Sequence, residues 1–170
     1  YQKEDGNLAL ILDTHEIDTG THNLSFIKNS IAVSALAITL GIDWGVLKTK
    51  LLSFTAPPGR CNVKHCNGVT IIDDTYNANL ASSLAAIDYL NAFSGNGRRI
   101  LVFGDMFELG TSSNEQHRRI GQKCSELNLD GVYTIGSHTK HTDSAISNGI
   151  DHIHYNSKDN LITSLKKKII

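Results

Sequence analysis

After Asp74, short apolar runs alternate with segments of helical periodicity, and this alternation constrains the fold more than any other feature of the chain. Strands are expected at 99–103, 132–135 and 152–155, and helices at 82–93, 114–127, 139–148 and 159–170. Strands that alternate with helices are joined by right-handed crossovers in a mostly parallel sheet. The later part of the chain is therefore predicted to be a small Rossmann-like α/β domain, with Ser112 or Ser113 capping the helix at 114–127.

The earlier part of the chain lacks this regular alternation. We expect a strand at 8–12, a polar turn at 13–21, a helix at 29–40 that Gly41 ends, and a second helix opened by Ile42-Asp43. Asn67-Gly68 suits a type I′ turn, so 63–66 and 69–72 are predicted to form a hairpin. A domain boundary is expected at 74–79, with the first part a remnant of a larger domain.

The composition is that of a soluble globular protein, with 40% apolar and 19% charged residues. A net charge of -1, from 16 basic and 17 acidic side chains, argues against a nucleic-acid partner. The apolar stretches are too short and too mixed to span a membrane. The chain starts without Met and stops within a helical pattern, so we expect a fragment of a longer protein.

The three cysteines, Cys61, Cys66 and Cys124, indicate reduced thiols and a cytoplasmic location, because their number is odd and no secretory signal is present. Cys61 and Cys66 with His65 between them do not have the spacing of a compact zinc site. We therefore expect no metal site built by this chain alone.

Polar groups follow two of the apolar runs. The run at 69–72 leads into Asp73-Asp74-Thr75-Tyr76-Asn77-Ala78-Asn79, and the run at 100–103 leads into Gly104-Asp105-Met106-Phe107-Glu108-Leu109-Gly110. A helical pattern follows each of them. Open α/β sheets bind ligands at the carboxyl ends of their strands, so both junctions are candidate binding segments.

In these motifs the chain resembles the Mur ligase family, and most closely its MurF branch. Four pieces match in order between residues 29 and 121: the helix from Asn29 with Leu40-Gly41-Ile42, the turn Gly59-Arg60, the junction 73–79, and the loop 104–110 followed by Ser113 and His117. The resemblance implies an ATP-dependent amide-bond ligase of peptidoglycan precursor synthesis. Such an enzyme joins D-alanyl-D-alanine to UDP-N-acetylmuramoyl-tripeptide through an acyl phosphate, with Mg²⁺.

The chain also departs from that family. The Gly-rich phosphate loop, the modified lysine that helps hold magnesium and the UDP-binding domain are absent, and Leu80 stands where the family usually has proline. The resemblance thus implies that residues 1–74 are the end of a central P-loop-type ATPase domain and that 75–170 are most of a Rossmann-like C-terminal domain. We expect this part alone to be inactive, with most magnesium ligands elsewhere in the parent enzyme.

The resemblance implies that one set of residues binds the nucleotide: Asn29, Arg60, Asp74, Tyr76, Asn77 and Asn79. Arg60 would contact phosphates, Asp74 the ribose hydroxyls, and the others the base or substrate. All of them except Tyr76 have a plainer alternative. Arg60 could be a surface arginine, Asp74 the cap of a turn, Asn29 a helix N-cap, and the other asparagines ordinary turn residues. Asp73 is predicted to be structural.

A second set, Asp105, Glu108 and His117, would belong to a loop that faces the incoming dipeptide. The alternatives are a strand-to-helix connector with a capping carboxylate, and a structural histidine on a helix face. Two other functions remain open at this point. One is a different Mur or folylpolyglutamate-synthase-like ligase, and the other is a non-catalytic nucleotide- or protein-binding module.

Overall fold

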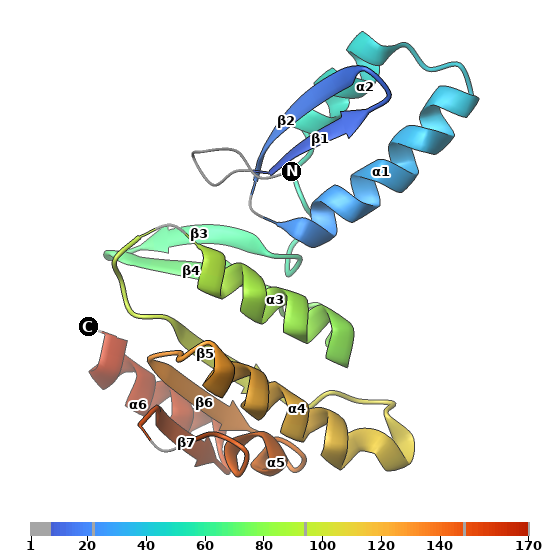
Figure 1. Cartoon of the computed structure of the whole chain (residues 1–170). Helices are drawn as coiled ribbons and strands as arrows, with labels where there is room; N and C mark the ends of the chain where they lie inside the picture. Colours follow the sequence, from blue (N-terminus) through green and yellow to red (C-terminus); the bar gives the residue numbers. More distant parts are fainter. Residues whose placement is uncertain (1–7, 22, 94, 148, 170) are drawn as a thin grey trace. The chain divides into compact units, whose positions relative to one another are not determined.

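The computed structural model describes residues 8–169 except 22, 94 and 148. The chain divides into two compact units, the first made of 1–57 with 92–94 and the second of 58–91 with 95–170 (Figure 1). The predicted α/β class, with a parallel sheet in the later part, is confirmed. The boundary at 74/75 between domains of the parent enzyme stays a prediction.

The first unit is built from an antiparallel strand pair and two helices. Strand β1 (Leu8–Leu12) pairs with β2 (His15–Thr21), and α1 (Leu24–Thr39) and α2 (Trp44–Leu52) follow. Its core forms where Leu10, Ile17 and Ile27 are buried together. The polar turn expected at 13–21 was wrong, because the chain turns at Asp13, with φ of 55°, and then pairs with β1.

Capping side chains set the starts of both helices. The Asn23 side chain accepts a hydrogen bond from the Phe26 N–H at 3.1 Å, so α1 begins five residues before the predicted start at Asn29. Asp43 accepts from the N–H groups of Gly45 and Val46 and starts α2, as its position predicted. The alternative interpretation of Asn29 as an N-cap was therefore wrong.

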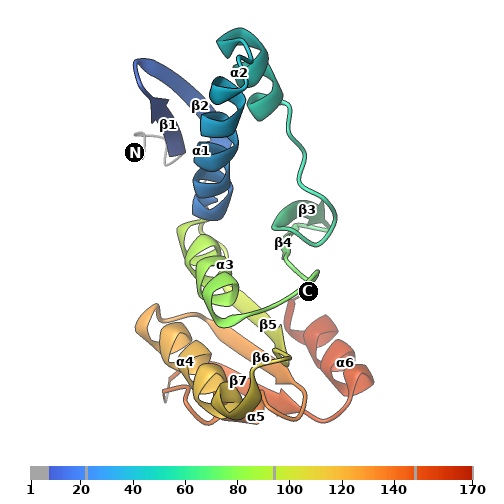
Figure 2. The same cartoon turned by 90° about the vertical axis from the view of Figure 1, so that its right-hand side faces the viewer.

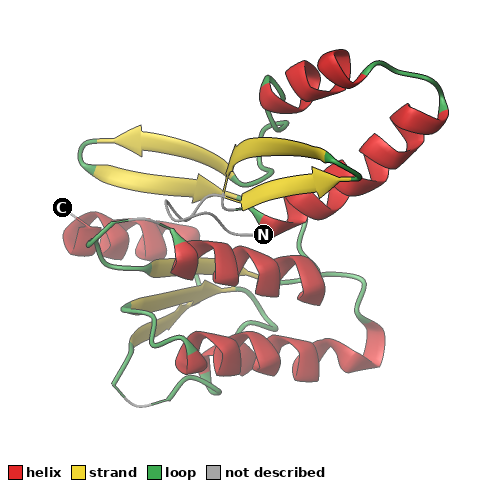
Figure 3. Ribbon diagram, turned by 45° about the horizontal axis from the view of Figure 1, so that its top comes forward, coloured by secondary structure: helices red, strands yellow, loops and turns green. Residues whose placement is uncertain are grey.

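The second unit opens with the predicted hairpin, drawn as a pair of antiparallel arrows in Figure 3. Strand β3 (Asn62–Cys66) pairs with β4 (Val69–Asp73). Asn67 and Gly68 both have positive φ, 49° and 76°, as a type I′ turn requires.

A parallel sheet of strand order β5-β6-β7 forms the centre of the second unit. The strands are β5 (Ile100–Gly104), β6 (Gly131–Ile135) and β7 (Asp151–Tyr155). The helices are α3 (Leu80–Ala92), α4 (Ser113–Glu126), α5 (Lys140–Asp143) and α6 (Lys158–Ile169), and a 3₁₀ turn at Gly110–Ser112 precedes α4. Strands and helices alternate as predicted.

Helices cover both faces of this sheet (Figure 2). On one face, Phe103 and Val132 pack with Ile87 of α3 and Ile120 of α4 in one apolar cluster. On the other face, the Lys168 ammonium of α6 lies 4.9 Å from the centre of the Tyr133 ring. Packed side chains on both faces of the sheet therefore hold strands β5 and β6, and with them their carboxyl ends, in place.

Two local predictions in this unit need correction. The helix expected at 139–148 is regular only over α5, and the predicted end at 148 lies outside the described residues. Ser112 stands at the N-cap of α4 but makes no capping bond, and Ser113 is already the first residue of the helix. The Ser112 hydroxyl donates to the Leu109 carbonyl at 2.7 Å and accepts from the Gln116 side-chain amide at 2.6 Å. Among the described residues, no helix combines the length and apolar character needed to cross a bilayer.

Candidate functional site

Arg60 and Tyr76 meet at the base of the β3–β4 hairpin. The Arg60 guanidinium lies over the Tyr76 ring, 4.0 Å from its centre, and both side chains are exposed. Beneath them, the Tyr76 N–H donates to the Gly59 carbonyl at 3.1 Å. Gly59 has φ of 75°, and a Cβ there would lie 2.9 Å from the Tyr76 nitrogen, so a glycine is required at this crossing.

Asp74 ties the same two segments together. Its Oδ1 accepts a hydrogen bond from the Cys61 N–H at 3.0 Å, across thirteen positions of sequence. We call Gly59, Arg60, Cys61, Asp74 and Tyr76 the Arg60 cluster. Asp74 thus neither caps the next turn nor stands alone; it fixes the loop that carries the guanidinium. A cation held over an aromatic face and open to solvent is suited to receive phosphate oxygens.

Asp73 has the structural role that the sequence predicted. Its carboxylate pairs with the Lys64 ammonium at 2.6 Å and accepts from the Thr75 hydroxyl at 2.7 Å. The hydrogen bond from Lys64, followed by that from Thr75, holds the pKa of Asp73 below its usual value. The pair closes the end of the hairpin beside the Arg60 cluster.

The asparagines are placed differently. Asn79 caps α3: its Oδ1 accepts from the Ser82 N–H at 2.9 Å, and the Ser82 hydroxyl oxygen accepts from the Asn79 N–H at 3.1 Å. The Asn77 Oδ1 accepts from the Ala78 N–H at 2.9 Å, and Asn77 is otherwise exposed. Asn29 is an exposed residue within α1, in the first unit. Within the second unit the structure brings together Arg60, Asp74 and Tyr76.

Asp105 forms the most heavily bonded part of the second junction. Its Oδ1 accepts from the N–H groups of His138 and Thr139, each at 2.9 Å, and its Oδ2 accepts from the Ser137 N–H at 2.7 Å. We call this arrangement the Asp105 clamp. Partial burial opposes ionisation, but the three N–H groups and the nearby His138 outweigh it, so the pKa of Asp105 lies below its usual value.

His117 is fully buried beneath the loop. Its Nε2 accepts from the Met106 N–H at 3.0 Å, and its Nδ1 lies 2.8 Å from the Ser113 carbonyl oxygen. Because Nε2 accepts, Nδ1 carries the proton and donates, which defines a neutral imidazole. His117 therefore holds the backbone of the loop from inside and presents no free ring nitrogen to a ligand.

The tip of the loop, in contrast, faces solvent. Phe107 is 73% exposed, and Glu108 is exposed with φ of 61°, a left-handed conformation that is unfavourable for a non-glycine residue. Sequence reasoning selected Glu108 but passed over Phe107 and the turn 137–139 that receives Asp105. The available signal for that turn was Gly136 directly after a strand, which marks close backbone approach.

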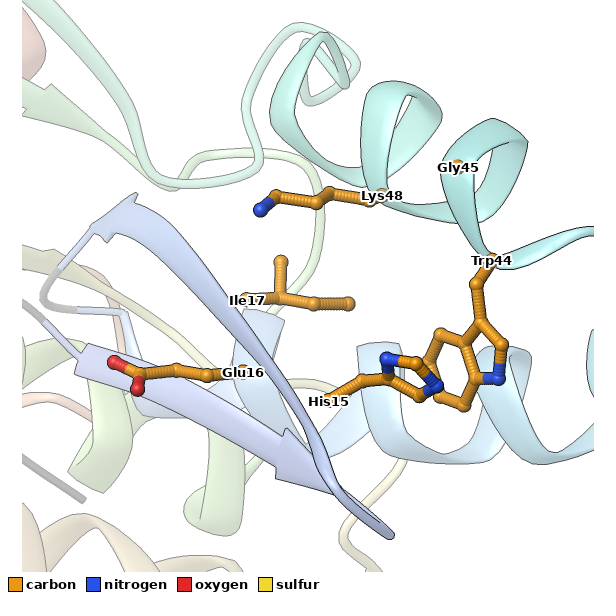
Figure 4. A pocket seen from close by; sticks show the side chains of 6 residues that line it. All are labelled: His15, Glu16, Ile17, Trp44, Gly45 and Lys48. Carbon is orange, nitrogen blue, oxygen red and sulfur yellow. The ribbon is translucent and has the colours of Figure 1, made fainter.

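The described residues contain no group of three His, Cys, Asp or Glu side chains arranged to hold a metal ion. Cys124 is buried, which raises the pKa of its thiol to about 12. A pocket of about 240 Å³ lies in the first unit, between β2 and α2 (Figure 4). It is lined by Ile17, Lys48 and the adjacent rings of His15 and Trp44, and by none of the predicted site residues.

Comparison with known proteins matches residues 59–169 to the family described as Mur ligase, glutamate ligase domain. The UDP-N-acetylmuramoyl-tripeptide–D-alanyl-D-alanine ligase of Buchnera aphidicola is 37% identical over 152 residues, which is 89% of this chain and 31% of the relative. MurF from Acinetobacter baumannii superposes with a TM-score of 0.85 at 26% identity, over 96% of this chain and 35% of that structure. MurF from Thermotoga maritima, solved in complex with ADP, gives 0.76 at 28% identity, over 92% of this chain and 35% of that structure. The chain thus spans about a third of the length of these proteins.

Proposed function

The chain belongs to the Mur ligase family, and on that premise we propose that the enzyme carrying it joins D-alanyl-D-alanine to UDP-N-acetylmuramoyl-tripeptide with ATP. The observation that supports this most directly is the match to the Buchnera ligase of that name over 89% of the chain. Both junction motifs lie inside the segment 59–169 that the family matches. The work would take place in the cytoplasm, where ATP and reduced thiols are found.

The proposed reaction has two steps. The tripeptide carboxylate attacks the γ-phosphorus of ATP, which gives an acyl phosphate and ADP. The dipeptide amine then attacks the acyl carbon, and the tetrahedral adduct releases phosphate and leaves an amide. Both steps require neutralisation of phosphate charge and close placement of the amine.

Arg60 is proposed to supply part of that charge neutralisation. Its guanidinium is a fork of donors matched to phosphate oxygens, and the Arg60 cluster holds its loop in place. Asp74 is proposed to accept the ribose hydroxyls with its carboxylate. Tyr76, Asn77, Asn79 and Asn29 are proposed as contacts of the base or substrate, and Asn79 would use its amide nitrogen because its oxygen caps α3.

The loop of Asp105, Glu108 and His117 is proposed to face the dipeptide. Glu108 carries the exposed carboxylate at its tip and would bind the ammonium group of the dipeptide before attack. Mg²⁺ would accompany the phosphates of ATP and lower their negative charge. We propose that most of its protein ligands lie outside this chain, because Mg²⁺ takes one or two carboxylates together with the phosphates and water.

The test uses the full-length enzyme and measures phosphate release from ATP with UDP-muramoyl-tripeptide, with and without D-alanyl-D-alanine. Release that depends on the dipeptide is expected, and Arg60→Ala should lower it strongly. Arg118→Ala is the matched control, because Arg118 is an exposed arginine paired with Glu115 on α4. Absence of dipeptide-dependent release would refute the proposed function and favour another ligase of the family or a non-catalytic module.

A further inference from the structure

The structure separates the loop at 105–110 into a fixed base and an exposed tip. We propose that Asp105 is a positioning residue, whose carboxylate fills a nest of backbone N–H groups in the β6–α5 turn and thereby holds the tip toward the dipeptide. This inference rests on the proposed function for the identity of the substrate. The clamp itself is a property of this chain and does not depend on the proposed function.

The geometry of the clamp is that of an anion-binding nest whose anion is supplied by the protein. Three successive N–H groups, those of Ser137, His138 and Thr139, converge on one carboxylate within 2.7–2.9 Å. Successive backbone N–H groups in a turn form concave sites of this kind for phosphate and carboxylate. Here the bound carboxylate belongs to Asp105, which follows the neighbouring strand β5. Gly104 at the end of β5 pairs with Ile135 at the end of β6, so the segments that follow the two strands leave the same edge of the sheet side by side.

Gly136 shows how closely the two turns approach. Its φ is 134°, and a Cβ at this position would overlap the Asp105 carboxylate, with Oδ2 only 2.6 Å away. The turn therefore combines a backbone angle and a free space that no other residue type provides. Such close fit indicates that the carboxylate is an integral part of the turn rather than a group that waits for a ligand.

The residue after Asp105 is fixed to a different element. The Met106 N–H donates to His117 of α4, its side chain is 1% exposed, and the Ser83 hydroxyl of α3 lies 3.7 Å from its sulfur. Two consecutive residues are thus held by β6–α5, α4 and α3 together. The chain then emerges at Phe107 and Glu108, so the direction of the tip is set by the base.

Asp105 could instead bind the substrate directly, and a variant without its side chain distinguishes the two roles. In Asp105→Gly the removed group is CH₂COO⁻, which free acetate reproduces in shape and charge. If the nest is the function, acetate should enter it and restore the loop. If Asp105 only binds the dipeptide, its removal should raise the dipeptide KM without speeding the hydrogen exchange of the loop amides.

The experiment measures kcat and KM of the full-length enzyme for each substrate, with acetate exchanged for chloride at constant ionic strength. Asp105→Gly is expected to raise the dipeptide KM about ten- to hundredfold, with little change in the KM for ATP. Acetate should lower the raised KM, whereas the bulkier trimethylacetate should not. Glu108→Gly is the matched control: it should also raise the dipeptide KM, but acetate should not restore it.

Hydrogen exchange on the 170-residue chain tests the clamp without any assay of activity. Asp105→Gly should speed the exchange of the amides from Met106 to Gly110 and from Ser137 to Thr139, and acetate should slow it again. Asp105→Asn serves if the glycine variant does not fold. Its amide fills the nest but turns a donor toward an N–H group, so exchange should rise and acetate should have no effect.

The outcomes separate the two proposals. Unchanged exchange in both variants, or a raised dipeptide KM that acetate does not lower, would overturn the clamp. A wild-type enzyme without dipeptide-dependent release would overturn the proposed function, and the exchange data would still decide whether Asp105 holds the loop.

Discussion

Replacing Gly136 by alanine is expected to open the Asp105 clamp, and Gly95 provides a control with nearly the same backbone angle. Gly136 has φ of 134° and Gly95 has φ of 132°, so alanine is strained to a similar degree at both positions. A methyl group on Gly95 would meet no atom within 4 Å beyond its chain neighbours, whereas a methyl group on Gly136 would overlap the Asp105 carboxylate. The difference between the two variants therefore isolates the clamp.

The expected magnitude follows from the bonds at risk. Holding a non-glycine residue in such a backbone region costs on the order of 1–3 kcal/mol, and this applies to both variants. At Gly136 the carboxylate must also move away from three N–H donors. Hydrogen bonds to a charged group contribute about 1.5–3 kcal/mol each. Asp105 is only half-buried, and water replaces part of the loss, so we expect an additional loss of about 2–4 kcal/mol.

The free energy of unfolding is measured by urea denaturation with far-UV circular dichroism, on the wild-type chain and both variants. Hydrogen exchange of Ser137, His138 and Thr139 then locates the change. Trp44 is the single tryptophan and lies in the first unit, so its fluorescence shows whether that unit keeps its fold. Equal losses in the two variants, or protected amides at 137–139 in Gly136→Ala, would refute the reasoning.

Three further predictions concern the second unit. Ile120→Ala should lower the free energy of unfolding by about 2–5 kcal/mol, because Ile120 is 0% exposed, while Ile162→Ala, at an exposed position, should change it little. Cys66, which is exposed, should react with a thiol reagent in the native chain, and the buried Cys124 should react only on unfolding. The pKa of Asp105 in the folded chain lies below 3.8, its ordinary value. Its ionised carboxylate therefore contributes fully to the free energy of unfolding above pH 3.8, and this contribution is lost as the pH falls through the folded-state pKa. On acidification the wild-type chain should lose more stability than Asp105→Asn does.

Local chemistry made much of the second unit predictable. The Asn67-Gly68 turn depends on two neighbouring residues that tolerate positive φ, and the hairpin appears where the dipeptide placed it. The alternation of strands and helices depends on periodicity within each segment, and it yields β5, β6 and β7 in a parallel sheet. These features need little information from distant parts of the chain.

Features that depend on contacts with another segment of the chain could not be predicted in this way. The segment of strand β2 contains one apolar residue, Ile17, which is too little to predict a strand from periodicity. The segment forms a strand because β1 supplies the partners of its backbone hydrogen bonds. The early start of α1 depends on the Asn23 cap, before the apolar stripe that was used to place the helix. Helix α5 also packs closely on α4, where a Cβ at Gly121 would overlap the Thr142 carbonyl oxygen, and the periodicity of residues 139–148 carries no information about that contact.

In the candidate site, the positions of the residues could be predicted from the sequence, but their contacts could not. Motifs identified the positions of Arg60, Asp74, Asp105 and His117, because each stands in a short recognisable segment. Their contacts were beyond reach: Asp105 bonds to groups 32 to 34 residues away, and His117 receives an N–H from eleven residues before it. The nucleotide and dipeptide roles of these residues stay predictions until the assays above are made.

The Arg60 cluster has a consequence for the order in which the chain assembles. Its tie between Cys61 and Asp74 spans thirteen positions, and a hairpin with a tight turn lies between them. Hairpins form in about 1–10 μs, far faster than the ribosome adds residues at roughly 5–20 per second. The cluster can therefore close as soon as the hairpin has emerged, whereas the Asp105 clamp must wait for Thr139. We expect the arginine to take its place over Tyr76 during synthesis, before the strands of the parallel sheet have come together.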